Sequence, residues 1–152
     1  MALTNPEFEA LLADTSKRID GDIEWSEDED HSACREFRAR VLSESGYSLF
    51  AKGTYNPIAG SLSFVLVYSG HGRIYGLDLG QDHKNPAGEK VGDKHKHKWT
   101  ERYRDKHAYV PADITASPKD VVLAWTQFCA EASIRHNGKM SAPKPSQDNL
   151  FI

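Results

Sequence analysis

The segment from Asp93 to Tyr109, DKHKHKWTERYRDKHAY, concentrates side chains that transfer protons or bind metals and anions. Its 17 residues include three histidines, six lysines or arginines and three aromatic residues. Successive side chains of an extended strand point to opposite faces. A strand over KHKHKW therefore places His95, His97 and Trp99 on one face and the three intervening lysines on the other.

Polar residues that precede this segment could join the histidine pair. Asp78 ends the predicted strand RIYGLDLG, and His83 and Asn85 lie in the loop that follows it. If this strand is the neighbour of the histidine strand, Asp78, His83, His95 and His97 converge at one edge of the sheet.

Three interpretations of this convergence stay open from the residue types alone. Two or three neutral imidazoles and a carboxylate can hold a divalent transition metal. Alternatively, two histidines can act as general base and general acid, one deprotonating a ribose 2′-hydroxyl and the other protonating the 5′-oxygen that leaves. In the third interpretation the histidines only donate hydrogen bonds to carbonyl or carboxylate groups and serve the structure.

Cationic and aromatic residues beside the histidine pair suit an RNA substrate under the acid–base interpretation. Lysine and arginine would neutralise phosphate groups, and tyrosine would stack on a base or donate a proton. We expect no cofactor and assign no metal ligand under this interpretation. The predicted catalytic residues are His83, His95, His97, Asp78 and Tyr103. The predicted substrate-binding residues are Lys98, Arg102, Arg104, Lys106 and Tyr109.

The charge distribution favours an anionic partner. The net charge is −3, but residues 1–45 carry 12 acidic and 5 basic side chains, and residues 46–152 carry 10 acidic and 14 basic ones. A basic surface opposed to an acidic arm fits nucleic acid as the first candidate ligand. A solvated face without a ligand is the alternative.

Composition predicts one cytoplasmic domain without membrane contact. A chain of 152 residues with 39% hydrophobic and 27% charged residues is typical of a soluble protein with one core. The longest apolar run, SLSFVLVY, has the length of a strand, and MALTNPEFEA lacks the pattern of a signal peptide. We expect the two distant cysteines to be reduced thiols.

The elements expected to position these residues are a β-meander and two helices. Helical spacing predicts a helix in TNPEFEALLADTSKRI, with Phe8, Leu11, Leu12 and Ile19 on one face, and another in SPKDVVLAWTQFCAEASI. Between them, alternating patterns separated by turn residues predict four to five antiparallel strands. The predicted fold class is α+β, with a single domain over residues 1–136. Glycine, two prolines and little apolar content predict a flexible tail over residues 137–152.

The segment RIYGLDLG through DHKNPAGEKVGDKHKHKWTERYRDKHAYVP resembles a motif of small uncharacterised bacterial proteins. These proteins are associated with mobile elements and toxin–antitoxin loci, and the TumE-like toxins share a thinner version of the motif. His107 departs from it, because an aromatic residue is expected there. The positions that match are Asp78, His83, Asn85, Pro86, Gly88, His95, His97, Trp99, Tyr103, Asp105, Lys106, Ala108 and Tyr109.

Together these features predict a toxin-like endoribonuclease that uses a histidine acid–base pair and no metal. Its expected partners are RNA or another nucleic acid, and a cognate protein. One alternative is a non-catalytic binding protein, either an antitoxin or a phage or mobile-element inhibitor of a defence system. A second alternative is a metal-dependent hydrolase with histidine ligands.

Overall fold

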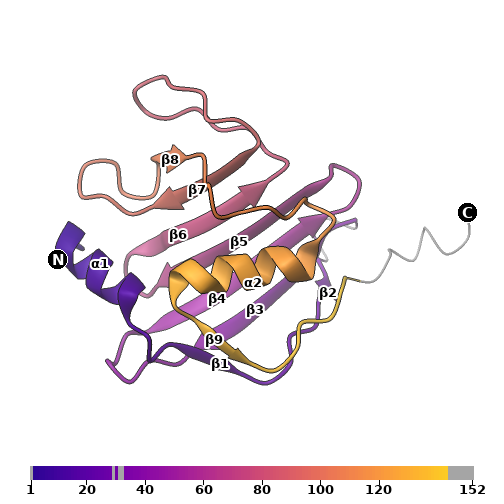
Figure 1. Cartoon of the computed structure of the whole chain (residues 1–152), viewed down its shortest axis with the longest axis horizontal. Helices are drawn as coiled ribbons and strands as arrows, with labels where there is room; N and C mark the ends of the chain where they lie inside the picture. Colours follow the sequence, from indigo (N-terminus) through magenta and orange to yellow (C-terminus); the bar gives the residue numbers. More distant parts are fainter. Residues whose placement is uncertain (1, 29, 31–32, 144–152) are drawn as a thin grey trace, which may run out of the picture.

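The computed structural model describes residues 2–28, 30 and 33–143. Within these residues, seven strands follow one another in chain order through one antiparallel sheet (Figure 1). The α+β class is thus confirmed, and the strand count exceeds the predicted four to five because both edge strands are only two residues long. The strands of this sheet are β2 (Ser26–Glu27), β3 (Arg35–Val41), β4 (Leu49–Asn56), β5 (Ser61–Tyr68), β6 (Gly72–Leu79), β7 (Lys94–Lys98) and β8 (Ala108–Tyr109).

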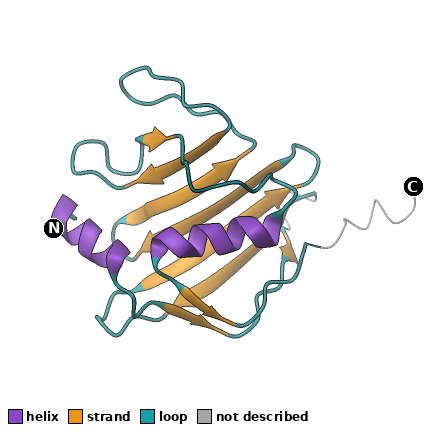
Figure 2. Cartoon of the chain, in the orientation of Figure 1, coloured by secondary structure: helices purple, strands orange, loops and turns teal. Residues whose placement is uncertain are grey.

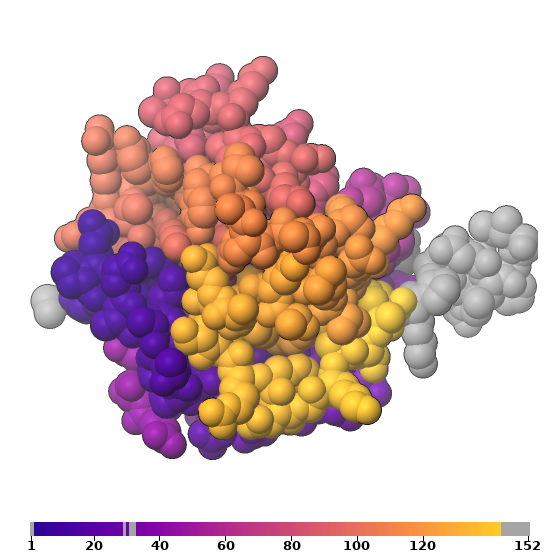
Figure 3. Space-filling model, in the orientation of Figure 1, coloured from indigo at the N-terminus to yellow at the C-terminus, as the bar shows by residue number. Residues whose placement is uncertain are grey.

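Helix α2 (Val121–Ala132) lies within the segment predicted to be helical and packs across one face of the sheet (Figure 2). Its buried stripe includes Trp125 and Phe128, whose rings pack against Phe64 of β5 at centroid distances of 5.2 and 5.7 Å. In the space-filling view, α2 and the N-terminal helix cover this face (Figure 3). The histidine side chains of β7 point to the opposite face, because Lys96 and Lys98, which alternate with them along the strand, contact α2.

The N-terminal helix α1 (Asn5–Ala13) is shorter than predicted. Thr4 caps it, and Lys17 then ends it by donating hydrogen bonds from its ammonium group to three backbone carbonyls at its C-terminal end. The prediction that Ile19 belongs to the helical face is therefore wrong. Ile19 lies in β1 (Arg18–Asp20), which pairs in parallel with β9 (Arg135–Asn137). Neither helix of the described chain is long and apolar enough to cross a membrane.

The chain stays bound to the domain beyond residue 136. Asn137 pairs with Asp20 in the small parallel sheet, and Met140 is buried and bridges to Ile23. Residues 137–141 of the predicted flexible tail are therefore held by the domain, the last through a hydrogen bond from the Ser141 N–H to the carbonyl of Ile23. Residues 144–152 lie outside the described residues.

The register between β6 and β7 brings the predicted site residues together. Asp78 of β6 is paired with His95 of β7, and Gly76 is paired with His97. Adjacent strands place directly opposed side chains about 5 Å apart. The two histidines therefore flank the Asp78 side chain, and the absent side chain at Gly76 leaves room for the second imidazole.

Gly80, at the start of the loop between β6 and β7, fixes the path of this loop. Its φ is +83°, and a Cβ atom at this position would lie 2.2 Å from the carbonyl oxygen of Gly60. A Gly80→Ala substitution should therefore lower the free energy of unfolding by about 2–4 kcal/mol, from backbone strain and this clash together. Gly88→Ala is the matched control: its φ is +99° with open space around the Cβ, so only the strain of about 1 kcal/mol applies. Equal losses in chemical denaturation would contradict this account.

Candidate active site

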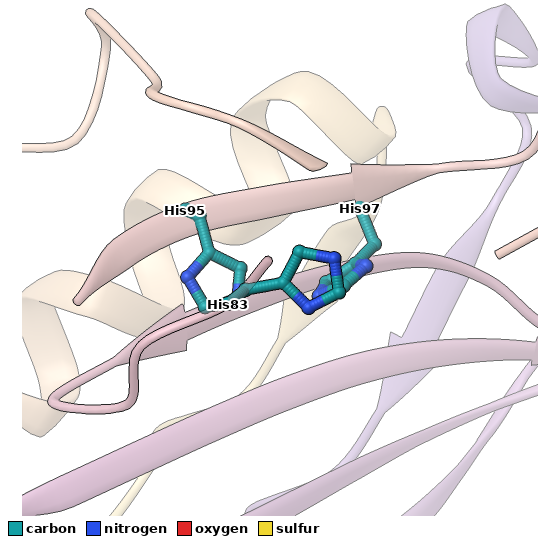
Figure 4. Close-up of side chains that lie close together, drawn as sticks. All are labelled: His83, His95 and His97. Carbon is teal, nitrogen blue, oxygen red and sulfur yellow. The ribbon is translucent and has the colours of Figure 1, made fainter. Parts of the chain in front are cut away.

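Three imidazoles meet beside the β6–β7 strand pair, as the sequence predicted (Figure 4). The ring centroids of His95 and His97 are 5.0 Å apart, and the His83 ring lies 5.3 Å from the first and 4.7 Å from the second. His95 and His97 come from β7 and are each 2% exposed. His83 comes from the loop after β6 and is only partly buried.

The carboxylate of Asp78 joins the two buried imidazoles. Its Oδ2 lies 3.0 Å from Nε2 of His95 and 3.2 Å from Nε2 of His97. The hydroxyl of Ser63 donates to the other carboxylate oxygen at 2.5 Å. Burial favours the neutral acid, but these hydrogen bonds outweigh burial and hold the pKa of Asp78 well below its usual range. The carboxylate is therefore charged at neutral pH.

The Nδ1 atoms of both buried imidazoles are fixed by backbone carbonyls. His95 Nδ1 lies 3.0 Å from the carbonyl oxygen of Gly92, and His97 Nδ1 lies 2.9 Å from that of Asp105. A carbonyl oxygen only accepts hydrogen bonds, so each Nδ1 donates to its carbonyl. The Arg73 guanidinium, which can only donate, is also near His97 Nδ1, but at a longer distance of 3.4 Å. When either ring is neutral, the lone pair on Nε2 then points at Asp78. Burial lowers the pKa of His95, but its hydrogen bond to Asp78 outweighs burial and raises it above the usual value.

The backbone carbonyl of Lys106 holds the third imidazole, that of His83. Its Nε2 lies 2.9 Å from the carbonyl oxygen of Lys106 and donates to it, so Nδ1 is the nitrogen that can accept a proton. Desolvation lowers the pKa of His83, which is therefore neutral at pH 7. Asn85 anchors the same loop, because its side-chain amide exchanges two hydrogen bonds of 2.8 Å with the backbone of Ala108. Asn85 therefore shapes the loop and does not join the imidazoles.

A pocket of about 460 Å³ opens beside the imidazoles. Its cationic side chains are Arg73, Lys84 and Lys106, which give it a capacity for anions. The Arg73 guanidinium lies 4.0 Å from the Asp78 carboxylate and 3.2 Å from that of Asp105. The pocket is lined by Arg73, Asp78, Gln81, Asp82, His83, Lys84, Pro86, His95, His97 and Lys106.

Sequence reasoning missed Arg73 because strand alternation misplaces it. Arg73 and Asp78 are an odd number of residues apart, which in a regular strand puts them on opposite faces. The β5–β6 register shifts between Leu66 and Val67, and Ile74 is the residue left over. This bulge turns Arg73 onto the face of Asp78. The available signal was its basic side chain near the start of a strand whose one other charged residue is Asp78.

Comparison with known proteins places the chain in a family. The profile of a family of unknown function (DUF6978) matches residues 3–134. The chain belongs to this family. No curated protein and no solved structure matches it. The matched span contains Asp78 and the three histidines, so the site lies within the part of the chain that defines the family.

Other predicted site residues lie away from the imidazoles. Lys98 and Tyr109 contact Glu131 of α2 on the opposite face of the sheet. The Arg102 guanidinium lies 5.0 Å from the ring of Tyr103, which stacks on His107. Arg104 lies over Trp99 at 5.9 Å. Of the predicted substrate-binding residues, Lys106 is the one that lines the pocket in the described chain.

Proposed function

We propose that the pocket beside His83, His95 and His97 binds the backbone of RNA and cleaves it. The observation that carries this proposal is the meeting of three imidazoles and a carboxylate in one pocket that also holds three cationic side chains. Phosphodiester cleavage needs proton transfer and stabilisation of negative charge at the phosphate, and these groups supply both.

Arg73 and Lys106 are positioned for the phosphate. Arg73 is 28% exposed at its side chain, and its guanidinium lies between the Asp105 and Asp78 carboxylates at the pocket wall. Lys106 is exposed at the rim beside His83. An arginine binds phosphate oxygens through two parallel N–H groups, and a lysine adds a point charge.

His83 is better placed for proton transfer than the predicted pair. His95 and His97 are almost fully buried, and each uses both ring nitrogens within the cluster. His83 is partly exposed, has a lowered pKa and presents Nδ1 as an acceptor. We assign the proton-accepting role to His83, which takes the proton of the 2′-hydroxyl as that oxygen attacks phosphorus. The imidazolium so formed returns the proton to the 5′-oxygen as its bond to phosphorus breaks, and the two histidines of β7 support the site.

The resemblance to proteins of toxin–antitoxin loci gives the proposal its biological setting. A cytoplasmic protein that cleaves RNA would be toxic on expression, and a cognate protein would restrain it. Toxicity that requires His83 would support this setting.

The proposal is tested by incubating the purified protein with a 5′-labelled single-stranded RNA and the matching DNA. We expect RNA cleavage, and a His83→Ala substitution should lower the rate at least about 100-fold because the proton acceptor is lost. His107→Ala is the matched control, since His107 stacks on Tyr103 away from the pocket, and it should retain the rate within about twofold. RNA that is bound but stays intact would contradict the proposal and favour the non-catalytic binding protein. Cleavage of the DNA alone would contradict RNA as the substrate.

A further inference from the structure

Three atoms that can donate an electron pair to a metal lie close together: Oδ2 of Asp78, Nε2 of His95 and Nε2 of His97. Each Nδ1 is committed as a donor to a backbone carbonyl, so each neutral ring points the Nε2 lone pair at Asp78 Oδ2. Three such atoms repel one another when nothing positive lies between them. The arrangement therefore needs either shared protons or a bound cation.

The two distances from Asp78 Oδ2 to the imidazole nitrogens match neighbouring ligand atoms around a divalent metal. Metal bonds of about 2.0–2.2 Å to imidazole nitrogen and carboxylate oxygen place neighbouring ligand atoms about 3.0–3.5 Å apart. The two Nε2–Oδ2 separations are 3.0 and 3.2 Å. Small shifts of these side chains would admit the ion.

The hydrogen-bond partners of Asp78, His95 and His97 are of the kind that hold metal ligands in place. A metal-bound histidine nearly always donates its second ring N–H to a carbonyl or carboxylate, which fixes its tautomer and orientation. Here the carbonyls of Gly92 and Asp105 accept from the two rings. Ser63 does the same for the carboxylate by donating to its free oxygen.

We propose that Asp78, His95 and His97 bind one divalent transition metal, through Oδ2 and the two Nε2 atoms. Imidazole with carboxylate suits Zn²⁺, Fe²⁺ or Co²⁺ better than Mg²⁺ or Ca²⁺. Three protein ligands leave a coordination position for water or a phosphate oxygen on the pocket side. The guanidinium of Arg73 lies 4.0 Å from Asp78 Oδ2, but its shorter contact is with the carboxylate of Asp105, at 3.2 Å, which offsets its charge.

His83 lies on the pocket side of this metal site. The ligand nitrogens of the three imidazoles all lie within 4.8 Å of one another. In the described residues, however, only His95 and His97 bring a nitrogen within 4.0 Å of the Asp78 carboxylate, and His83 does not. We therefore place His83 beside the metal and not among its ligands. This site stands on the geometry alone and does not rest on RNA cleavage.

Zinc chloride is the probe for this inference. The full chain, stripped with a chelator, should take up one Zn²⁺ per molecule and melt at a higher temperature with the metal. In the nitrogen-15 NMR spectrum of the zinc-loaded protein, the rings of His95 and His97 should both be neutral, keep the Nδ1–H proton and show metal-shifted Nε2 signals. No retained zinc and no change in melting temperature would overturn the site, whatever the outcome with RNA.

Substitutions then assign the ligands. His97→Ala should weaken zinc binding at least about 100-fold, and Ser63→Ala, which leaves all three ligands in place, about 10-fold. His107→Ala and His83→Ala should bind zinc within about threefold of the unaltered protein. Circular dichroism checks that each variant is folded. If His97→Ala does not fold, Ser63→Ala and the NMR signals still decide the question. Unchanged affinity in the folded His97→Ala and Ser63→Ala variants would overturn the assignment.

Discussion

An Asp78→Asn substitution should lower the free energy of unfolding of the metal-free protein by about 3–5 kcal/mol. The asparagine has almost the same shape, so it leaves no cavity. It removes the charge that accepts hydrogen bonds from His95 and His97, which are each 2% exposed. Removing one partner of a buried charged pair leaves the other without compensation, which is the costly case.

The loss of unfolding free energy caused by Asp78→Asn should depend on pH, and the raised pKa of His95 determines whether it is larger at low or at high pH. Its folded pKa is raised above the usual value, chiefly by Asp78 acting against burial. Its protonation therefore stabilises the fold fully below about pH 6.5, and this contribution disappears as the pH rises through the raised pKa. Asp78→Asn abolishes the raise. The difference between the two proteins should accordingly be larger at pH 6 than at pH 8.5.

Urea denaturation in the presence of a chelator, at both pH values, measures this difference. Asp20→Asn is the matched control, because Asp20 is exposed and pairs with Arg18 at the surface; its effect should be small at both pH values. A loss with Asp78→Asn that is equal at pH 6 and pH 8.5 would contradict the coupling between Asp78 and His95.

Strand periodicity explains how much of the site the sequence could predict. Alternation put both imidazoles of KHKHK on one face, and the Leu-Asp end of the preceding strand put a carboxylate beside them. The same alternation turns Lys98 to the other face, where it contacts Glu131. Its assignment to the substrate followed from its charge alone, not from its position on the strand.

Irregular backbone explains what could not be predicted. Arg73 reaches the pocket through a bulge in β6, which depends on pairing with a neighbouring strand. Arg104 has a φ of +54°, so the loop after β7 reverses where no glycine marks a turn. Ile19 has the spacing of the buried face of α1, but it lies beyond the end of this helix. The ammonium group of Lys17 binds the carbonyls at the helix C-terminus. Neither strand alternation nor helical spacing encodes these deviations. The bulge depends on the partner strand, and the other two depend on hydrogen bonds within the loop after β7 and at the end of α1.

A Lys96→Met substitution should lower the free energy of unfolding by about 3–5 kcal/mol. Lys96 stands between the two histidines of β7 but points to the opposite face, where it is fully buried. Its ammonium lies 2.8 Å from the carboxylate of Glu131 in α2 and 2.6 Å from that of Asp113. The hydroxyls of Tyr75 and Tyr109 donate to the same Glu131 oxygen. Methionine fills the volume but leaves these acceptors without their main cation.

Acid titration identifies Glu131 as the coupled partner. Burial raises the pKa of Glu131, but hydrogen bonds from Lys96, Lys98 and Tyr75 outweigh burial and lower it to about 2. A carboxyl with a lowered pKa stabilises the fold above its unfolded pKa of about 4.3, and this contribution is lost as the pH falls toward 2. Stability should therefore decline over this window by on the order of 2–3 kcal/mol. The decline should be weaker with Lys96→Met.

A double substitution separates the ion pair from simple packing. With Lys96→Met and Glu131→Met together, no buried charge is left alone, so the loss should be smaller than the sum of the two single losses by at least about 1 kcal/mol. Additive losses would contradict direct coupling.

Zinc affinity shows whether the contacts of Lys96 only stabilise the fold or also control the geometry of the histidines. Backbone hydrogen bonds between β6 and β7, and not the ammonium of Lys96, set the register that opposes Asp78 to His95. The folded Lys96→Met variant should therefore bind zinc within about threefold of the unaltered protein, in contrast to His97→Ala, one position along the same strand. A large loss of zinc affinity in Lys96→Met would instead mean that the contacts with α2 control the geometry of the histidines across the sheet.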